Sequence, residues 1–439
     1  MASEHKSGWP LRSLSSCATY QEGYVNPSQG VPGYFGDDVR WLRAVDLNDS
    51  FVHETSRRLS FAGFSSAGKA AKLFRPGSLA ISKSGTIGRL GILQAEMCGN
   101  RAVINIEPHP DIDTRFLFYS LLANRERIIQ MADGSVQKNL YVSQLGIIEL
   151  HVPPLGAQRA IAETLGSLDD KIEQNRRTGA KLEGLARAVF KAWFVDFEPV
   201  KAKAAGGTGF QPVMGGKQRQ DAAATFPGMP PETFAALPTR LEDSELGPVP
   251  QGWEVKPLSE VVKLTMGQSP KSEFYNEEGR GLPFHQGVTD YGFRFPSDRV
   301  YCTAEGRIAE SGDILLSVRA PVGRINVADR RLMLGRGLAG MRHLNDQQSF
   351  LLYQMFHVFA EEDAIGDGTI YKAVNKDFLS AMPLIAPPKQ MRNAFEAVVR
   401  PMDELIVAAE KESAKLATLR DYLLPRLLSG RVRVRGEIT

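Results

Sequence analysis

The sequence predicts an α+β fold built from two tandem copies of one module, each a globular domain followed by a long helix. The first observation behind this prediction is that short motifs recur in the same order along the 439 residues. The second is that each globular part combines short β-rich segments with one amphipathic helix. The third is an apolar repeat in steps of three and four residues after each globular part.

The duplication rests on four motifs that recur at nearly one offset in the numbering. Gly8-Trp9 with Leu14-Ser15 recurs as Gly252-Trp253 with Leu258-Ser259, at an offset of 244. Segment 77–89 recurs as 312–324, at an offset of 235. Segment 133–138 recurs as 367–372, and Pro153-Pro154 recurs as Pro387-Pro388, both at an offset of 234. Copy two is therefore nine residues shorter in its first part, since the offset falls from 244 to 235. Length changes concentrate in surface loops, where functional contacts also concentrate.

Each globular part is expected to hold a mostly antiparallel sheet, because Gly, Pro and Asn separate its short β-rich runs. The predicted strands are 77–81, 87–93 and 102–106 in copy one and 313–318 and 324–328 in copy two. The predicted amphipathic helices are Thr114 to Met131 and Asn345 to Glu361.

The long helices follow the Pro-Pro pairs, and their apolar or small residues form matching seams. The seams are Leu165, Leu168, Ile172, Asn175, Gly179, Leu182, Ala186 and Val189, and, at the same offset of 234, Val399, Met402, Ile406, Ala409, Ser413, Leu416, Arg420 and Leu423. One interpretation is two ordinary amphipathic surface helices, but matching register favours an antiparallel coiled coil. The residues in the middle of the seams, Asn175 and Gly179 in the first and Ala409 and Ser413 in the second, would then face each other.

Two features interrupt this helical pattern. Pro401 and Pro425 predict that the second helix is bent or broken near those points, because proline removes a backbone donor. Between the first helix and copy two, eight of the chain's 26 prolines lie from Pro199 to Pro250, among Ala and Gly runs. This composition predicts an extended or partly disordered linker.

Composition excludes several classes of protein. Lys plus Arg is 53 and Asp plus Glu is 50, so a net charge of +3 argues against a wholly basic nucleic-acid coat. The three cysteines lie far apart, which excludes a disulfide framework and fits a reducing compartment. No apolar signal segment or long transmembrane-type apolar run is present, so we expect a soluble cytoplasmic protein.

Catalytic chemistry is not predicted. Segment 63–70 almost matches a phosphate-binding loop, but Ala70 replaces the hydroxyl residue that would ligate Mg²⁺, which favours a Gly-rich surface loop. Val152 and Ala386 precede the Pro-Pro pairs, so the [ND]-P-P-[FY] signature of amino-methyltransferases is missing. The seven histidines are scattered. We expect no catalytic residue, no metal site and no cofactor.

Polar loops are the remaining candidate sites, because their side chains suit phosphates and base edges. The loops 82–86 and 317–321 could bind a phosphate through backbone N–H groups or could be tight turns with an exposed cation. Gln, Asn, Lys and Arg side chains pair with purine edges, and Lys138 and Lys372 are expected to contact the DNA backbone. The candidate DNA-binding residues are Lys83, Arg89, Gln137, Lys138, Asn139, Arg40, Arg43, Gln268, Lys271, Arg319, Arg324, Tyr371, Lys372 and Asn375, with Arg57, Arg58, Arg294 and Arg336 as further possibilities.

The pattern resembles the specificity (S) subunit of type I restriction-modification enzymes. The motifs that carry the resemblance cover nearly the whole chain. They are segments 77–89 and 134–138, Pro153-Pro154-Leu155 with 158–162, the run Trp193 to Pro199, and the run Ser244 to Trp253. The resemblance implies a non-catalytic subunit that reads a bipartite duplex DNA site, one half-site per recognition domain. It also implies docking of methyltransferase (M) subunits, two per chain, and of restriction (R) subunits.

The domain boundaries expected from this resemblance follow the repeats. They are recognition domain 1 at 1–152, helical region 1 at 153–198, a Pro/Gly/Ala-rich linker at 199–247, recognition domain 2 at 248–386, helical region 2 at 387–432 and a tail at 433–439. Two other functions remain open at this point. One is a methyltransferase fused to its own reader, against which the missing signature argues; the other is a coiled-coil scaffold that never touches DNA.

Overall fold

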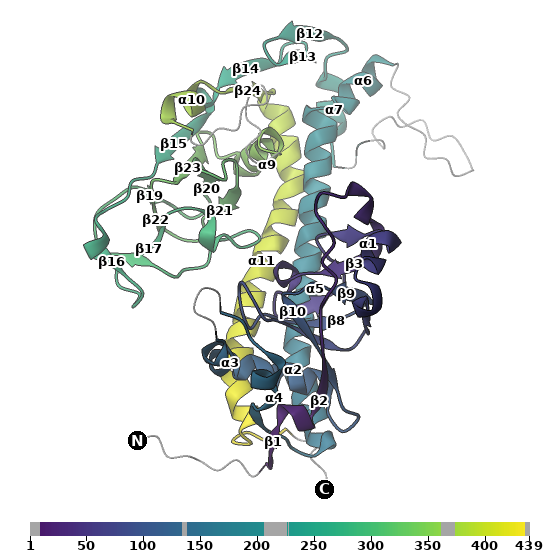
Figure 1. The fold of residues 1–439 in the computed structure, drawn as a ribbon. Coiled ribbons are helices and arrows are strands. Elements are labelled where there is room, and N and C mark those ends of the chain that lie inside the picture. The colour runs from purple at the N-terminus through teal and green to yellow at the C-terminus, as the bar shows by residue number, and fades with distance from the viewer. Residues whose placement is uncertain (1–8, 134–137, 206–225, 227, 361–373, 435–439) are drawn as a thin grey trace. The chain divides into compact units, whose positions relative to one another are not determined.

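Two long helices organise the computed structural model of the chain (Figure 1). They are α5 (Leu155–Phe194) and α11 (Lys389–Leu428), each of 40 residues. The structure describes residues 9–133, 138–205, 226, 228–360 and 374–434. These fall into two units, unit 1 with residues 1–174 and 412–439 and unit 2 with residues 175–411, so each unit contains part of each long helix.

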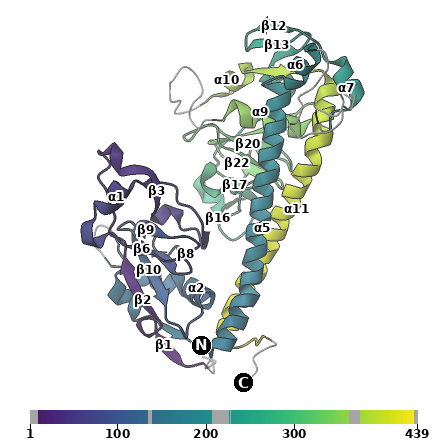
Figure 2. The same cartoon turned by 90° about the vertical axis from the view of Figure 1, so that its right-hand side faces the viewer.

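In both units the helices run antiparallel, and they lie side by side in both ribbon views (Figures 1 and 2). In unit 1, Asp169 accepts from Arg420 at 2.7 Å and Lys171 pairs with Glu412 at 3.2 Å. Residue numbers therefore increase along α5 in the direction in which they decrease along α11. In unit 2 the Asn175 amide donates to the Ala409 carbonyl at 3.4 Å. The predicted antiparallel coiled coil and α+β fold class are confirmed.

The globular part of unit 1 consists of three small sheets and four α-helices among the residues that the structure describes. Its sheets have the strand orders β2-β10-β7-β8-β4, β5-β3-β9-β6 and β1-β11. Pairing is antiparallel except between β3 and β9 and between β4 and β8. The elements are β1 (Leu11–Ser13), β2 (Ala18–Glu22), β3 (Phe35–Leu42), β4 (Ser50–Val52), β5 (Arg58–Leu59), α1 (Phe61–Ser65), β6 (Leu73–Phe74), β7 (Leu79–Ser82), β8 (Leu90–Leu93), β9 (Met97–Gly99), β10 (Val103–Pro108), α2 (Thr114–Ala123), α3 (Arg125–Met131), α4 (Val142–Gly146) and β11 (Glu149–His151).

The globular part of unit 2 repeats this plan. Its sheets have the orders β15-β23-β20-β21, β16-β18-β17-β22-β19 and β14-β24, again with a parallel pair next to antiparallel ones. The elements are β14 (Glu254–Pro257), α8 (Leu258–Val261), β15 (Val262–Met266), β16 (Tyr275–Asn276), β17 (Leu282–His285), β18 (Tyr301–Cys302), β19 (Ile308–Ala309), β20 (Ile314–Ser317), β21 (Ile325–Val327), β22 (Leu332–Leu334), β23 (Leu338–His343), α9 (Gln348–Val358), α10 (Lys376–Ala381) and β24 (Pro383–Ala386).

The main hydrophobic core of each unit takes side chains from both long helices. In unit 1, Leu424 and Leu427 of α11 are buried with Ile161 and Leu165 of α5. In unit 2 the aromatic end of α5 is buried with residues of α9 and α11, and the rings of Phe194 and Phe350 lie 5.0 Å apart. The Trp193-Phe194 motif is therefore a core element, since aromatic side chains bury large apolar areas.

Two predicted helices differ from the structure. The predicted helix Thr114 to Met131 is two helices, because the chain leaves helical geometry at Asn124, whose side-chain amide donates to the Ser120 carbonyl at 2.8 Å. The helix predicted to start at Asn345 begins at Gln348 and ends at Val358. The Gln348 side chain accepts from the backbone N–H of His343, so the residues between them form a turn before the helix.

The expectation of a broken second helix is wrong, since α11 runs through both Pro401 and Pro425. Both prolines are exposed. A carbonyl that loses its N–H partner to proline can then bond to water, which lowers the cost of keeping the helix continuous.

The described parts of the predicted linker are folded rather than extended. They form α6 (Glu198–Ala204), α7 (Pro231–Ala236) and an antiparallel hairpin of β12 (Leu241–Ser244) and β13 (Gly247–Pro250). Val200, Met229 and Leu237 are buried in the core of unit 2, and this burial holds the segment in place. The Pro-rich composition alone did not reveal that these three residues are buried.

His343 should make unit 2 less stable at low pH. Burial, and then the charge of Arg392, lower the pKa of His343 to about 4, against the opposing charge of Asp346. Its Nδ1 accepts the N–H of Asn345 at 3.0 Å, a bond that requires an unprotonated Nδ1. Because the pKa of His343 is lower in the folded protein than in the unfolded chain, neutral His343 contributes to the free energy of unfolding. This contribution, up to about 3 kcal/mol, is complete above about pH 6.5 and is lost as the pH falls toward about 4.

The measurement is the free energy of unfolding by urea at several pH values, for the wild type and His343→Asn. The asparagine keeps an acceptor near the Nδ1 position but does not titrate in this range. The wild type should lose more stability than the variant between about pH 6.5 and 4. Parallel pH profiles for the two proteins would contradict a neutral buried His343.

Candidate nucleic-acid interface

The motif that identified the duplication is a tight turn in both copies. The Ser82 hydroxyl donates to the Thr86 carbonyl at 2.5 Å and accepts the Arg89 N–H at 2.9 Å, and Ser317 makes the same two bonds to Pro321 and Arg324. Both serines are fully or almost fully buried. The hydroxyls therefore close the turn in both copies.

The ends of four strands and the start of a fifth meet beside this turn in each copy, and the same backbone hydrogen bonds join them. In unit 1 the bonds are Gly23 N–H to Val103 (3.0 Å), Asn100 N–H to Leu42 (2.9 Å), Lys83 N–H to Ala102 (2.8 Å) and Leu140 N–H to Lys83 (2.8 Å). In unit 2 they are Gly267 N–H to Leu338 (2.9 Å), Gly335 N–H to His285 (2.9 Å), Val318 N–H to Gly337 (2.9 Å) and Val374 N–H to Val318 (2.8 Å). We call residues 23–26, 43, 83, 100–103 and 140 site 1, and residues 267–269, 286, 318, 335–338 and 374 site 2.

A glycine makes the close approach of strands possible in both sites. A Cβ atom added to Gly23 would lie 2.1 Å from the Asn100 carbonyl oxygen, and one added to Gly267 would lie 2.1 Å from the Gly335 carbonyl oxygen. Only a residue without a side chain fits at such a contact. The two sites therefore share one backbone framework, at equivalent positions of the duplicated chain.

The side chains on this framework differ between the sites. Lys83 of site 1 pairs with Glu22 at 2.9 Å, and both side chains are mostly buried. Although burial opposes it, the bonds from Lys83 and Tyr24 hold the pKa of Glu22 below its usual range. The equivalent residues of copy two are Met266 and Val318, so the ion pair becomes an apolar pair. Lys83, a candidate for DNA contact, is therefore committed to Glu22 in this structure.

The exposed side chains around each site are mainly cationic or amides. In site 1, Asn26 and Arg101 are exposed, Arg43 is partly exposed, and Lys138 and Asn139 directly precede Leu140. In and beside site 2, Gln268, Lys271, Gln286, Arg319 and Arg336 are exposed. Sequence reasoning missed Arg101 and Gln286. Arg101 and Arg336 differ in number by the motif offset of 235, which could have identified Arg101.

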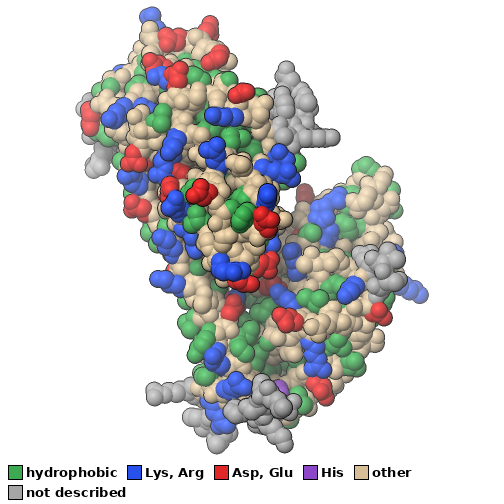
Figure 3. All heavy atoms as spheres, turned by 90° about the vertical axis from the view of Figure 1, so that its left-hand side faces the viewer, with side chains coloured by type: hydrophobic (Ala, Val, Ile, Leu, Met, Phe, Trp, Pro, Cys, Tyr) green, Lys and Arg blue, Asp and Glu red, His purple; other side chains and the backbone are tan. Residues whose placement is uncertain are grey.

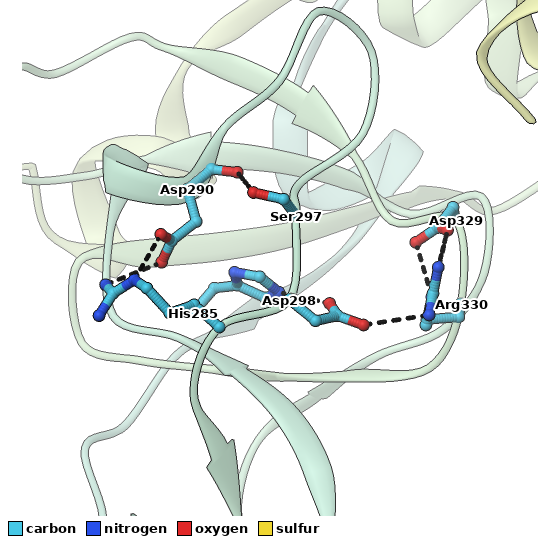
Figure 4. Close-up of polar contacts among 7 residues, drawn as sticks. His285, Asp290, Ser297, Asp298, Asp329 and Arg330 are labelled. Atoms are coloured by element: carbon cyan, nitrogen blue, oxygen red, sulfur yellow. Dashed lines mark hydrogen bonds and ion pairs between the residues drawn. The ribbon is translucent and has the colours of Figure 1, made fainter. Parts of the chain in front are cut away.

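A group of charged residues lies next to the end of strand β17 in unit 2 (Figure 4). The buried His285 places Nε2 3.4 Å from Asp298, and Arg330 pairs with the same carboxylate at 3.0 Å. Bonding to Asp329, and then the charge of Asp298, raise the pKa of Arg330. His285 directly precedes the exposed Gln286, and the pairing of His285 with Leu334 of β22 fixes where Gln286 emerges.

The other candidate residues have varied surroundings. Arg40 bonds to Glu54 at 2.5 Å, and this bond, with the charges of Arg40 and Arg58, lowers the pKa of Glu54 despite partial burial. Asn375 lies beside site 2, but its side chain accepts the N–H of Phe378 at 2.8 Å as the N-cap of α10. Arg89 and Arg324 are exposed at the ends of the tight turns. Gln137, Tyr371 and Lys372 lie outside the described residues.

Arg294 belongs to the interior of unit 2. Its side chain is 4% exposed and lies 3.3 Å from both Glu183 of α5 and Asp403 of α11. Tyr353 of α9 donates to the same Asp403 at 2.7 Å. The charge of Arg294 is thus used to join the globular part to both long helices, and it is not available at the surface.

Surface charge does not concentrate in one region of the visible face. In Figure 3, Lys and Arg side chains alternate with Asp and Glu over the surface that faces the viewer. Across the described residues, no helix is long and apolar enough to cross a membrane, and no group of three or more His, Cys, Asp and Glu side chains is placed to hold a metal.

Comparison with known proteins gives a family match in both copies. The family model described as the type I restriction modification DNA specificity domain matches residues 7–183 and 250–406. The type I restriction enzyme MjaIX specificity subunit of Methanocaldococcus jannaschii is 23% identical over 446 residues, covering 97% of this chain and 94% of that protein. The HindI specificity subunit of Haemophilus influenzae is 27% identical over 375 residues, covering 74% and 79%.

A further relative and a solved structure complete the comparison. The putative MjaX specificity subunit of M. jannaschii is 34% identical over 199 residues, a match that spans 47% of that protein and 44% of this chain. The crystal structure of the type I restriction-modification S subunit from M. genitalium aligns with a TM-score of 0.52 at 16% identity, over 97% of this chain and 98% of that one. That likeness supports the fold alone.

The family that the sequence motifs resemble is thus confirmed, and the two matched segments correspond to the two copies. With the family model matched over most of its length, the chain belongs to the family of type I restriction-modification DNA specificity subunits, which are non-catalytic.

Proposed function

We propose that the two globular parts of this specificity subunit each read one half-site of a bipartite duplex DNA sequence. The observation that carries the proposal is the pair of equivalent sites, with one backbone framework and different exposed side chains. A framework that is kept while its polar side chains change suits recognition of two different sequences by one geometry. Lys, Arg and Gln around the sites match phosphates and base edges.

The proposal extends to the partners of a type I complex. The relatives are named as subunits of type I restriction enzymes. We assign methyltransferase subunits, two per chain, to the two equivalent helical regions, with restriction subunits joining that core in the cytoplasm. The net charge of only +3 fits a subunit whose partners neutralise part of the DNA phosphate charge.

An exchange of one recognition domain tests this assignment. Residues 1–150 are replaced by the equivalent part of another specificity subunit, and the methylome of cells carrying the chimaera with its methyltransferase subunit is sequenced. One half-site should change while the other half-site stays the same, because each unit has its own hydrophobic core. The unmodified chain with the same methyltransferase subunit is the control.

Two other results would contradict the proposal. A change in both half-sites would mean that the two parts read DNA jointly. If the assembled complex shows no salt-dependent binding to duplex DNA, the chain is a coiled-coil scaffold instead, since phosphate contacts make DNA affinity fall with salt.

A further inference from the structure

We infer that Arg43 and Gln286, which occupy equivalent positions in the two sites, are base-reading residues at which the two half-sites differ. Arg43 would face a guanine and Gln286 an adenine. The inference rests on the proposed function, since it names the residues and bases of the same DNA contact. Arg43 was one of many candidates from the sequence, whereas Gln286 was not among them.

The equivalence of the two positions follows from backbone pairing. Arg43 directly follows β3, which pairs in parallel with β9, and Gln286 directly follows β17, which pairs in parallel with β22. The last carbonyl of each strand accepts a backbone N–H at 2.9 Å, Leu42 from Asn100 and His285 from Gly335. The next side chain therefore leaves both sheets at the same point of the framework.

Gln286 is exposed and yet held in place. The Ser269 hydroxyl donates to its Oε1 at 3.0 Å and accepts from its Nε2 at 2.8 Å. The second N–H of Nε2 and the second lone pair of Oε1 remain for a ligand. A Cβ atom on Gly335 would lie 2.6 Å from the Cα of Gln286, and one on Gly337 would lie 2.5 Å from its carbonyl oxygen. Two glycines thus fix its backbone. A glutamine amide presents the donor and acceptor that match adenine N7 and N6 in the major groove.

Arg43 is held by corresponding means. Its Nη2 donates to the Ser56 hydroxyl at 2.6 Å, and its guanidinium carbon lies 5.5 Å from the centre of the Trp41 ring. Its Nε is buried, has no hydrogen-bond partner among the described residues and forms an ion pair with Asp46 at 4.0 Å, so the Nη atoms are the part of the guanidinium left for a base. The side chain is 26% exposed. A serine hydroxyl therefore orients the reading group in each site, and a fixed guanidinium fork matches guanine O6 and N7.

A second pair of residues is shared rather than different. Arg101 and Arg336 occupy equivalent turns, at an offset of 235, and both are exposed. Each backbone N–H lies 3.4 Å from a side-chain oxygen of its own site, Asn26 or Ser269. An identical cation in both sites suits a contact that both half-sites share, such as a phosphate, while the differing residues next to it carry the discrimination.

Reciprocal exchange of the two side chains tests the inference. Arg43→Gln and Gln286→Arg are expressed separately with the methyltransferase subunit, and the methylated motif is read by methylome sequencing. Arg43→Gln should replace one guanine by adenine in the half-site of copy one. Gln286→Arg should replace one adenine by guanine in the half-site of copy two. In each case the other half-site and the spacer should stay unchanged.

Matched controls make the same chemical changes elsewhere. Gln251→Arg adds a cation at an exposed turn of unit 2, and Arg75→Gln removes an exposed one (77% side-chain exposure) from unit 1. Both should leave the motif as it is. If an exchanged variant methylates too weakly to read, Gln286→Ala in the purified complex should reduce discrimination at one base of the site by about 5- to 150-fold, the range of a bidentate pair.

The outcomes separate this inference from the proposed function. Unchanged bases in both exchanged variants, or Gln286→Ala with full discrimination, would overturn the assignment of these residues while the bipartite reader stands. If the wild-type complex itself methylates no bipartite motif, the proposed function fails first. A Ser269→Ala variant adds a positioning readout, since it should weaken discrimination at the same base that Gln286→Arg changes.

Discussion

Replacing Arg294 with Met should destabilise unit 2 by about 3–5 kcal/mol, because the substitution leaves two carboxylates without their buried cation. Glu183 and Asp403 have side-chain exposures of 11% and 16%, and each lies 3.3 Å from the Arg294 guanidinium. Methionine keeps much of the side-chain volume, so the loss reports on charge rather than on a cavity. The measurement is the free energy of unfolding in urea.

An exposed ion-pair variant and a rescue variant serve as controls for Arg294→Met. Arg331→Met removes an exposed ion pair with Glu310 in the same unit and should cost at most about 1 kcal/mol. Adding Glu183→Gln and Asp403→Asn to the Arg294 variant should recover part of the stability, because neutral amides cost less to bury than charges. A loss for Arg294→Met no larger than that for Arg331→Met would contradict this account.

Unit 1 contains a similar group of a tyrosine, an aspartate and an arginine, but its arginine comes from a long helix. Tyr119 donates to Asp169 at 2.5 Å, as Tyr353 donates to Asp403, and both pairs of equivalent residues differ in number by 234. In unit 1 the cation is Arg420 of α11, at 2.7 Å from Asp169. Both copies therefore fasten the globular part to a long helix through a tyrosine, an aspartate and an arginine.

Inserting seven residues into each long helix should lengthen the spacer of the recognised site by about three base pairs. Seven residues preserve the coiled-coil seam and add about 10 Å to each helix at about 1.5 Å per residue. The insertions should follow Asn175 and Ala409, because these two residues face each other. Methylome sequencing then reads the motif: unchanged half-sites with a longer gap are the expected result.

Binding strength alone does not decide this experiment. Three extra base pairs rotate the DNA groove by about 100°, since one turn takes about 10.5 base pairs, so affinity can fall even when the ruler model is correct. Altered half-site bases with the original gap would refute the model. As a control, seven residues are inserted after Asn175 alone, which puts the paired seams out of register and should abolish methylation of either motif.

The structure also corrects where such insertions belong. Matching seams predict that two helices pair, but two positions with equal numbering in their own copies need not face each other. Glu183 of α5 is buried against Arg294, so an insertion beside it would disturb this ion pair. Asn175 and Ala409 belong to the small middle positions that the sequence predicted to face each other, and the hydrogen bond between them confirms this for the pair.

For the candidate sites, too, the sequence and the structure contribute different information. Five candidates named from the sequence lie in or beside sites 1 and 2: Lys83, Lys138, Asn139, Arg43 and Gln268. It could not tell that Lys83 is paired with Glu22 or that Arg294 is buried. An exposed and a buried arginine look alike in a sequence, because charge pairing depends on residues that are distant along the chain.

The sequence by itself determined the duplication, the α+β class and the long paired helices, because each leaves a periodic or repeated pattern along the chain. The family came from the resemblance of its motifs to a known family. The tertiary structure decided which candidate cations are buried or paired, that part of the proline-rich segment folds, and that Arg43 and Gln286 are equivalent. These facts depend on the parallel pairing of strands far apart in sequence and on burial against other elements. Such contacts have no local signature, and only the folded chain brings their partners together.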